Sequence, residues 1–341
     1  MPLKNLNDFK SEVIENENVI VGSGAGGSTV AYELLKKNKD SIILEEGPNI
    51  NGINKSNIGI SIANLYKNNG ATPIYSFNGG PLIGYGQGSC VGGSTYVNAG
   101  YFSGTPEWVY NEWLKQERLK TSYSEFQKLY EEIKSEINVS TENITKLDGA
   151  SEIMSLIANK KKFKIEKCER FSDGITGNEK NNMNSTYHKS LLKKNIQIIH
   201  DCEVVKILSK NNRAYMITVK DKKNGKKVNI KFKNLFICCG PISSPHLLMK
   251  NKLINNQKNQ NNFEFHINFR VLVKFKKDTN FNLNRSYDPD HPVSVYFMRE
   301  FEKEGALLSS ANSELPYMLA TSSHFNEKIK RDIYQNFSKY C

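Results

Sequence analysis

Cysteine is scarce in this sequence, with 6 residues among 341, and no two of them have the CxxC spacing of a zinc or redox pair. So few scattered cysteines exclude a disulfide framework and favour a reducing compartment. The 6 histidines show no HExxH spacing, so the sequence predicts no metal site. No run of about 18 apolar residues is present, and this excludes a self-sufficient transmembrane helix.

The N-terminal segment also lacks the apolar stretch of a secretory signal, because its first 18 residues are polar and lean acidic. We therefore expect a cytoplasmic protein. The charge balance is 47 − 35 = +12, but the lysines are spread along the chain, so no nucleic-acid partner is predicted. Peripheral association with a membrane surface stays compatible with this charge.

A nucleotide-binding βαβ unit is predicted near the N-terminus. The β-branched run 19–21 leads directly into Gly22-Ser23-Gly24-Ala25-Gly26-Gly27, and a helical pattern covers residues 28–37. A second buried strand is predicted over residues 41–44, and it ends at Glu45. This order of strand, glycines, helix, strand and terminal acid is typical of a dinucleotide-binding fold.

Each glycine of this loop has a predicted task. Gly22 permits the tight turn, Gly24 lets the backbone approach a pyrophosphate, and Gly27 allows close packing of helix on strand. The helix N-terminus offers N–H groups to the phosphates. Glu45 follows Gly22 by 45 − 22 = 23 positions and can accept hydrogen bonds from a ribose diol. This acid argues against NADP, but it does not decide between NAD and FAD.

A second glycine-rich stretch, residues 84–100, is too rich in glycine for a regular element and would let a flat ligand come close. It contains VGGSTYVNAG at 91–100 and is followed by Thr105-Pro106 and a tryptophan-bearing helix at 111–113. With the βαβ unit, this stretch resembles the glucose–methanol–choline (GMC) oxidoreductase family. Within it the resemblance is greatest to the cholesterol-oxidase-like, long-chain-alcohol-oxidising bacterial branch.

Four later segments extend the resemblance over about residues 18–310. They are 177–187, 201–207, LFICCGPISSPHLLM at 235–249, and 265–271. The resemblance implies an α/β fold, with a three-layer, Rossmann-like FAD/NAD(P)-binding domain and an interleaved, incomplete antiparallel substrate domain. The implied division is 16–110 with 165–255 for FAD binding, 111–164 as a helical insertion, and 262–341 as the partial substrate domain.

The resemblance also implies a set of cofactor-binding residues. They are Gly22, Ser23, Gly24 and Gly27 for the pyrophosphate, Glu45 for the ribose, Gly92, Gly93, Ser94, Asn98 and Ala99 along the isoalloxazine and pyrophosphate path, and Val204 for the adenine. Some relatives attach FAD through a histidine just before the matching asparagine. Because that position is Val97 in this chain, the cofactor is expected to be non-covalent FAD.

The implied activity is oxidation of an alcohol CH–OH group with hydride transfer to flavin N5. In the family a C-terminal histidine accepts the hydroxyl proton, but nothing after Tyr317 matches that segment, and we assign no catalytic residue. We therefore expect an N-terminal part or truncated form, with a second polypeptide as one source of the histidine. A non-catalytic flavin-binding remnant or partner subunit is the alternative, followed by an NAD-dependent dehydrogenase.

Periodicity predicts several further elements. A surface helix is expected over 122–146, and separate strands over 227–232 and 235–239. Two antiparallel strands are expected over 271–275 and 293–301.

Overall fold

The computed structural model describes residues 3–51, 58–70, 72–75, 79, 83–116, 119–141, 149–171, 181–254, 271–276, 296–310, 325–336 and 339. The chain divides into two compact units, which are described separately below. The first unit is Met1–Asn98 with Asn182–Phe265, and the second is Ala99–Asn181 with His266–Cys341.

The first unit contains most of the strands. Its strands are β1 (Leu3–Lys4), β2 (Val13–Val21), β3 (Ile42–Leu44), β4 (Pro73–Ile74), β5 (Ile83–Gly84), β9 (Gln197–Ile199), β10 (Cys202–Lys210), β11 (Arg213–Asp221) and β12 (Lys227–Ile237). Its α-helices are α1 (Ala25–Lys36), α2 (Ile58–Leu65), α3 (Ser94–Val97), α7 (Tyr187–Lys193) and α8 (Gly240–Lys250), with short 3-10 helices at Leu6–Asp8 and Lys67–Gly70.

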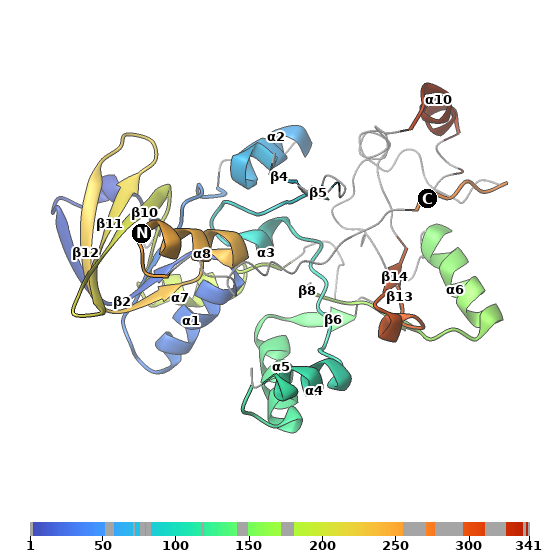
Figure 1. Ribbon diagram of the computed structural model, residues 1–341, viewed down its shortest axis with the longest axis horizontal. Helices are drawn as coiled ribbons and strands as arrows, with labels where there is room; N and C mark the ends of the chain where they lie inside the picture. The colour runs from blue at the N-terminus through green and yellow to red at the C-terminus, as the bar shows by residue number, and fades with distance from the viewer. Residues whose placement is uncertain are drawn as a thin grey trace. The chain divides into compact units, whose positions relative to one another are not determined.

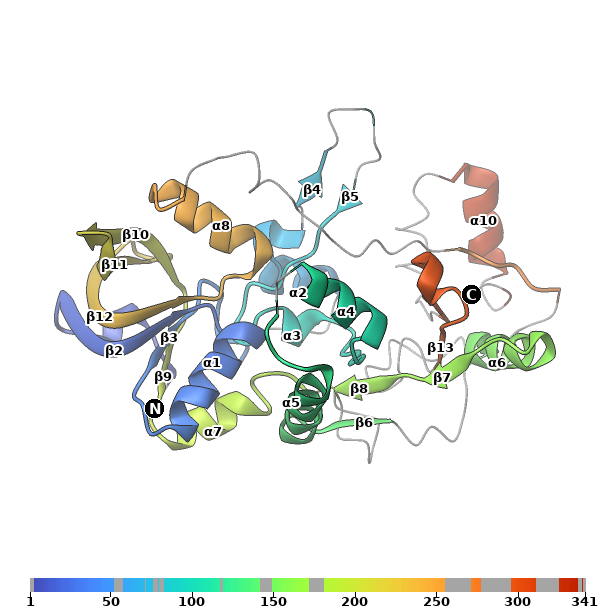
Figure 2. The same ribbon diagram turned by 60° about the horizontal axis from the view of Figure 1, so that its bottom comes forward.

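A seven-stranded sheet organises this unit in the order β1-β9-β3-β2-β12-β11-β10. The pairs from β1 to β12 are parallel, and the pairs β12–β11 and β11–β10 are antiparallel. In both views α1 and α7 lie side by side against the sheet, as Figure 1 and Figure 2 show. The parallel part places the carboxyl ends of β2 and β3 at one edge, where α/β folds bind ligands.

Side-chain alternation along the central strands builds two cores, one on each face of the sheet. Ile20, Ile43 and Ile198 pack with Ala31 of α1 and Leu191 of α7. Their neighbours in the strands face the opposite way and pack with the β10–β12 meander and α8, through Val19, Val21, Ile42, Leu44, Ile199, Val204, Ile217, Val228, Ile230 and Leu247. The mixed α/β fold with a parallel sheet expected from the sequence is therefore confirmed.

Two sequence predictions in this unit change in detail. The predicted helix 28–37 begins earlier, at Ala25, directly after the glycine loop. The strands predicted over 227–232 and 235–239 are one strand, β12. It pairs with β11 over its first part and with β2 along its length, so residues 233 and 234 do not interrupt it.

The second unit has shorter elements. They are α4 (Glu107–Lys115), α5 (Tyr123–Glu136), β6 (Val139–Thr141), α6 (Gly149–Lys161), β7 (Ile165–Lys167), β8 (Glu169–Phe171), β13 (Tyr296–Met298), a 3-10 helix at Glu302–Glu304, β14 (Leu308–Ser309) and α10 (Glu327–Gln335). They form a three-stranded sheet, β14-β13-β7, and a two-stranded sheet, β6-β8.

The helix predicted over 122–146 is wrong beyond Glu136. Ser122 caps α5 with a capping box, but Asn138 adopts a left-handed φ of 56° directly after the helix ends. Residues 139–141 then pair with β8 instead of continuing the helix. Residues 142–148 lie outside the described residues.

The predicted strand 271–275 is also wrong, since residues 271–276 contain no strand. The strand predicted over 293–301 corresponds to β13, which pairs antiparallel with β14 and β7; residues 293–295 lie outside the described residues. None of the helices in the described residues has the length and apolar character needed to cross a membrane.

Candidate functional site: two glycine-rich stretches at one sheet edge

The first glycine loop, residues 22–27, is the turn from β2 into α1, and its shape requires two of its glycines. Gly22 has a φ of 102°, and a Cβ at this position would lie 2.3 Å from the carbonyl oxygen of Cys238. A Cβ on Gly27 would lie 1.9 Å from the carbonyl oxygen of Gly22. Both contacts are shorter than any van der Waals distance, so side chains are excluded here.

The N-terminus of α1 is open to an anion. Gly24 is the N-cap residue, and no side chain caps the helix. Ala25 and Gly26 of the first turn are exposed. A Cβ on Gly24 would have only the Gly93 Cα, at 3.9 Å, as a close neighbour. Uncapped N–H groups at the positive end of a helix are the usual partners of a phosphate.

Glu45 lies at the end of β3 and is bound to the loop. Its Oε2 accepts from Ser23 N at 3.0 Å and from Ser23 Oγ at 2.6 Å, and its Oε1 accepts from Gly47 N at 2.9 Å. A carboxylate has about four acceptor positions. Three are therefore used within the chain, and one on Oε1 is left for a ribose hydroxyl.

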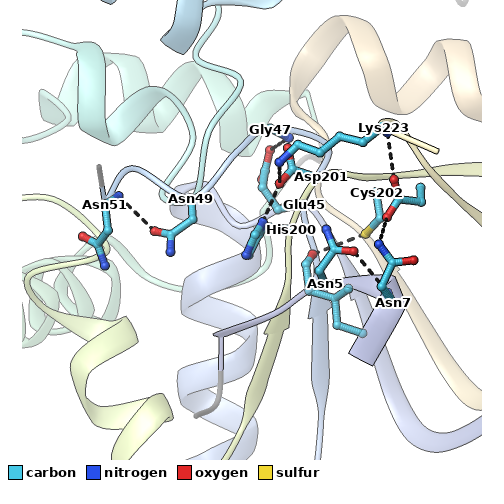
Figure 3. Close-up of polar contacts among 12 residues, drawn as sticks. Asn5, Asn7, Glu45, Gly47, Asn49, Asn51, His200, Asp201, Cys202 and Lys223 are labelled. Carbon is cyan, nitrogen blue, oxygen red and sulfur yellow. Dashed lines mark hydrogen bonds and ion pairs between the residues drawn. The ribbon is translucent and has the colours of Figure 1, made fainter. Parts of the chain in front are cut away.

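Glu45 is only 5% exposed, and this burial raises the pKa of its carboxyl above 4.5, against the opposing effect of its hydrogen bonds to Ser23 and Gly47. Figure 3 shows Glu45 and Gly47 beside the turn at Asp201, whose carboxylate accepts from Lys223 Nζ at 2.9 Å. Asp201 N and Cys202 N donate to the carbonyls of Gly47 and Glu45, each at 3.0 Å. The start of β10 is thereby fixed next to Glu45.

Val204 belongs to this start of β10. Its side chain is buried in the core under the meander, so only its backbone is available to a ligand. The register between β10 and β11 shifts between Val204 and Lys206. On the side away from β11, no strand of the described residues pairs with β10.

The second glycine-rich stretch contacts the first directly. Gly92 N donates to Ser23 Oγ at 3.0 Å, so Ser23 joins Gly92 to Glu45. Gly93 has a φ of 55°, and a Cβ on it would lie 2.8 Å from the Gly24 Cα. The structure thus brings together the loop, the acid and the first half of VGGSTYVNAG, which are distant in the sequence.

The remaining predicted residues of this stretch are Ser94, Asn98 and Ala99. Ser94 Oγ accepts from Gly88 N at 3.0 Å, and both Ser94 and Asn98 are exposed. Ala99 belongs to the second unit, where its carbonyl accepts from Arg170 Nη2 at 3.0 Å. The site geometry described here therefore covers the predicted residues from Gly22 to Asn98 and Val204.

Sequence reasoning missed three polar residues under the loop, of which Ser28 and His188 are buried and Asn184 is half-buried. Ser28 Oγ donates to the Ser23 carbonyl at 2.8 Å and lies 2.8 Å from His188 Nε2. His188 Nδ1 lies 2.8 Å from Asn184 Oδ1, and Asn184 Nδ2 donates to the Val91 carbonyl at 2.7 Å. No spacing in the sequence signals this arrangement, because it joins three separate segments.

The second unit has an open cavity of about 550 Å³ lined by paired charges. Tyr130 and Lys134 of α5 both donate to the Glu169 carboxylate, and burial together with Glu169 raises the pKa of Tyr130. Arg299 pairs with Glu166 and Glu302. These charges are neutralised within the unit.

No group of metal-ligating side chains occurs among the described residues. Three of the histidines, His266, His291 and His324, lie outside those residues, as does the segment 265–270 that the resemblance places at the start of a substrate-side strand.

The residues present fit the adenosine diphosphate half of FAD. The cradle between Gly24 and Gly93 has no Cβ, the end of α1 has no cap, and Glu45 keeps one acceptor position. Gly24 and the uncapped first turn of α1 would face the pyrophosphate, Gly22, Ser23 and Gly27 would shape the loop that presents them, Glu45 would face the ribose, and Val204 would offer its backbone to the adenine.

Comparison with known proteins finds related oxidoreductases. An uncharacterized GMC-type oxidoreductase (y4nJ) of Sinorhizobium fredii is 25% identical over 255 residues, which cover 70% of this chain and 50% of that protein. The long-chain-alcohol oxidase FAO1 of Arabidopsis thaliana is 24% identical over 267 residues, covering 71% of this chain and 35% of that protein. This chain spans half the length of these curated relatives or less.

Among solved structures, formate oxidase of Aspergillus oryzae matches with a TM-score of 0.53 and 16% sequence identity, over 70% of this chain and 48% of that chain. At this identity the match shows a shared fold. Residues 16–268 match the family profile described as GMC oxidoreductase, and this is more than half of the chain. The chain therefore belongs to the GMC oxidoreductase family, whose members are flavoproteins.

Proposed function

We propose that this chain binds FAD non-covalently and forms the flavin-binding part of an oxidoreductase that acts on CH–OH groups of alcohols. One observation carries the proposal: Ser23 joins the two glycine-rich stretches, accepting from Gly92 N and donating to Glu45, next to the uncapped end of α1. A single glycine loop would suit many nucleotides. The second stretch, with exposed Ser94 and Asn98, adds a backbone surface for the rest of a flavin dinucleotide.

The residues of this chain have binding and orienting tasks in the proposed function. When bound, FAD accepts a hydride from the alcohol carbon. The N–H groups of α1 hold the pyrophosphate, and Glu45 fixes both Ser23 and the ribose. Val97 stands where some relatives carry the histidine that attaches FAD, which supports non-covalent binding.

The substrate class and the proton acceptor are the finer parts of the proposal. The match to FAO1, a long-chain-alcohol oxidase, supports a long-chain alcohol over a polar one. The family's histidine segment has no counterpart in the sequence given, so the proposal places the base on another segment or on a second polypeptide. We also retain as proposals the cytoplasmic location and the division into 16–110 with 165–255, 111–164 and 262–341.

The alternative is a flavin-binding remnant or partner subunit without activity. Reduction of an electron-accepting dye by a long-chain alcohol, with this chain alone, would exclude it. An NAD-dependent dehydrogenase is the second alternative, and the contact of Gly93 with Gly24 favours FAD over it, because the added stretch has no task in an NAD site.

The test of the proposed function is an FAD titration of the purified full chain, followed by flavin absorbance. Wild type should take up one FAD, which acid should release intact. Gly24→Ala places a Cβ at 3.9 Å from the nearest heavy atom, so it fits the fold but occupies the pyrophosphate surface. We expect it to weaken FAD binding by at least about tenfold.

Gly104→Ala is the matched control, because Gly104 belongs to the second unit and a Cβ there would be at an ordinary contact distance, 3.4 Å from the Tyr130 ring. It should bind FAD as wild type does. A wild-type chain that takes up no FAD, or equal binding by the Gly24 variant, would overturn the proposed site.

A further inference from the structure

A buried histidine lies under the first glycine loop, and the binding residues named above do not include it. His188, on α7, is 1% exposed, and Ser28, in the first turn of α1, is fully buried. The His188 Nε2 and the Ser28 Oγ are 2.8 Å apart. Tyr187 beside it stacks on Tyr32 of α1 with 4.2 Å between ring centroids, so α7 is fixed against α1.

The polar chain through His188 ends at both glycine-rich stretches. On one side Ser28 Oγ donates to the carbonyl of Ser23 in the loop. On the other side Asn184 links His188 to the carbonyl of Val91, directly before Gly92. His188 is therefore the middle member of a connection between the two stretches.

The proton positions follow from the acceptors. Asn184 Nδ2 must face the Val91 carbonyl, so Asn184 Oδ1 faces His188 and requires a proton on Nδ1. Burial lowers the pKa of His188 to about 4, so the ring is neutral at neutral pH. Nε2 is then an acceptor, and the single proton of the Ser28 hydroxyl is shared between Nε2 and the Ser23 carbonyl, each 2.8 Å from Oγ.

Packing alone does not explain a histidine at this position. An imidazole removed from water costs free energy unless its nitrogens are bonded, whereas a leucine would fill a helix interface without that cost. Both nitrogens of His188 have partners, and one partner stands in the turn whose N–H groups face the pyrophosphate.

The structure assigns His188 as a positioning residue for the flavin pyrophosphate: through Nε2 and Ser28 it holds the first turn of α1 where its N–H groups meet the phosphates. This inference rests on the proposed function. The assignment gives the two ring nitrogens of His188 different roles. The Nε2 contact positions the loop, whereas the Nδ1 contact only joins α7 to Val91.

Two variants divide these contacts. The amide of His188→Gln reaches the place of Nε2 and keeps the link to Ser28, whereas His188→Asn reaches the place of Nδ1 and keeps the link to Asn184. Each variant loses one buried hydrogen bond, so both should lower the melting temperature by similar amounts. FAD binding to the full chain, measured by flavin fluorescence, should separate them.

We expect His188→Gln to weaken FAD binding less than about threefold and His188→Asn by about tenfold. Ser28→Ala removes this link and also the contact with the Ser23 carbonyl, without changing α7, and should weaken binding at least as much as His188→Asn. The double variant Ser28→Ala with His188→Asn should bind no more weakly than Ser28→Ala alone, because the second change removes an interaction that is already lost.

Equal weakening by the Gln and Asn variants, or additive effects in the double variant, would overturn the assignment while leaving the proposed function intact. Wild-type protein that binds no FAD would overturn both. Side-chain ¹⁵N shifts of His188 give a second readout: a proton on Nδ1 supports the assignment, and a proton on Nε2 alone contradicts it.

Discussion

Gly22 and Gly27 of the first glycine loop lie against backbone atoms, whereas Gly92 of the second stretch lies against a side chain from a distant part of the chain. Gly22 and Gly27 are fixed against the carbonyls of Cys238 and Gly22 itself. Gly92 instead lies against the amide of Asn184, where a Cβ would be 2.5 Å from Nδ2. The two glycines of the first loop therefore face backbone atoms, whereas Gly92 faces a side chain.

This difference has a consequence for mutation. Backbone contacts cannot move away, so a side chain at Gly22 or Gly27 must displace the neighbouring strands or α1. Side chains such as Asn184 can rotate, but only by giving up the hydrogen bonds to Val91 and His188. The first loop should therefore be less tolerant than the second.

The largest expected effect is that of Gly27→Ala. Its Cβ would lie 1.9 Å from the Gly22 carbonyl oxygen, so β2 and α1 must separate. We expect a loss of about 3 kcal/mol or more in the free energy of unfolding. Urea unfolding of the flavin-free chain measures this, with Gly84→Ala as the control expected within about 0.5 kcal/mol of wild type. A Gly27 variant as stable as the control would contradict the geometry of the loop.

Gly93→Ala should have an intermediate effect, because its Cβ would lie 2.8 Å from the Gly24 Cα and its φ is 55°. We expect a loss of about 2 kcal/mol, combining strain and contact. The same unfolding series measures it. A loss as large as that of Gly27→Ala would show that the two stretches are held in the same way.

Glu45→Gln should have the smallest effect on stability, but one that depends on pH. Burial raises the pKa of Glu45, so between pH 4.5 and that raised value the folded chain keeps a proton that the unfolded chain has lost. Wild type therefore loses stability as the pH rises through this window.

Glutamine does not ionise, so the Glu45→Gln variant lacks this pH-dependent contribution to the free energy of unfolding. The free energy of unfolding of wild type minus that of Glu45→Gln should fall through the window and be level above it. A difference that rises with pH would mean that hydrogen bonds from Ser23 and Gly47 outweigh the burial of the carboxylate.

The same contrast explains what the sequence could predict. The βαβ unit was predicted nearly complete, because strand, glycines, helix and acid follow each other within 30 residues or so and are fixed by local packing. The glycines of the second stretch could be identified only by resemblance. Their connection through Ser28, His188 and Asn184 depends on α7 packing against α1, which no local pattern contains.

The wrong bounds predicted for a helix and for two strands also come from tertiary contacts that the sequence pattern does not contain. The apolar spacing after Ser122 continues past Glu136, but Asn138 takes the left-handed conformation and residues 139–141 pair with β8. The periodicity of apolar residues along the sequence does not indicate which residues pair with a distant strand. In β12 the opposite occurred, since pairing with β2 extends one strand through residues that separate two apolar runs.

The central claim is that the first glycine loop and Glu45 bind the adenosine half of a flavin dinucleotide. Competitive titration of the full chain with FAD, FMN and ADP tests it most directly, since FMN has the flavin but not the adenosine. We predict that FAD binds at least about 100-fold more tightly than FMN and that ADP displaces it. Equal affinity for FAD and FMN, with no competition by ADP, would contradict the claim.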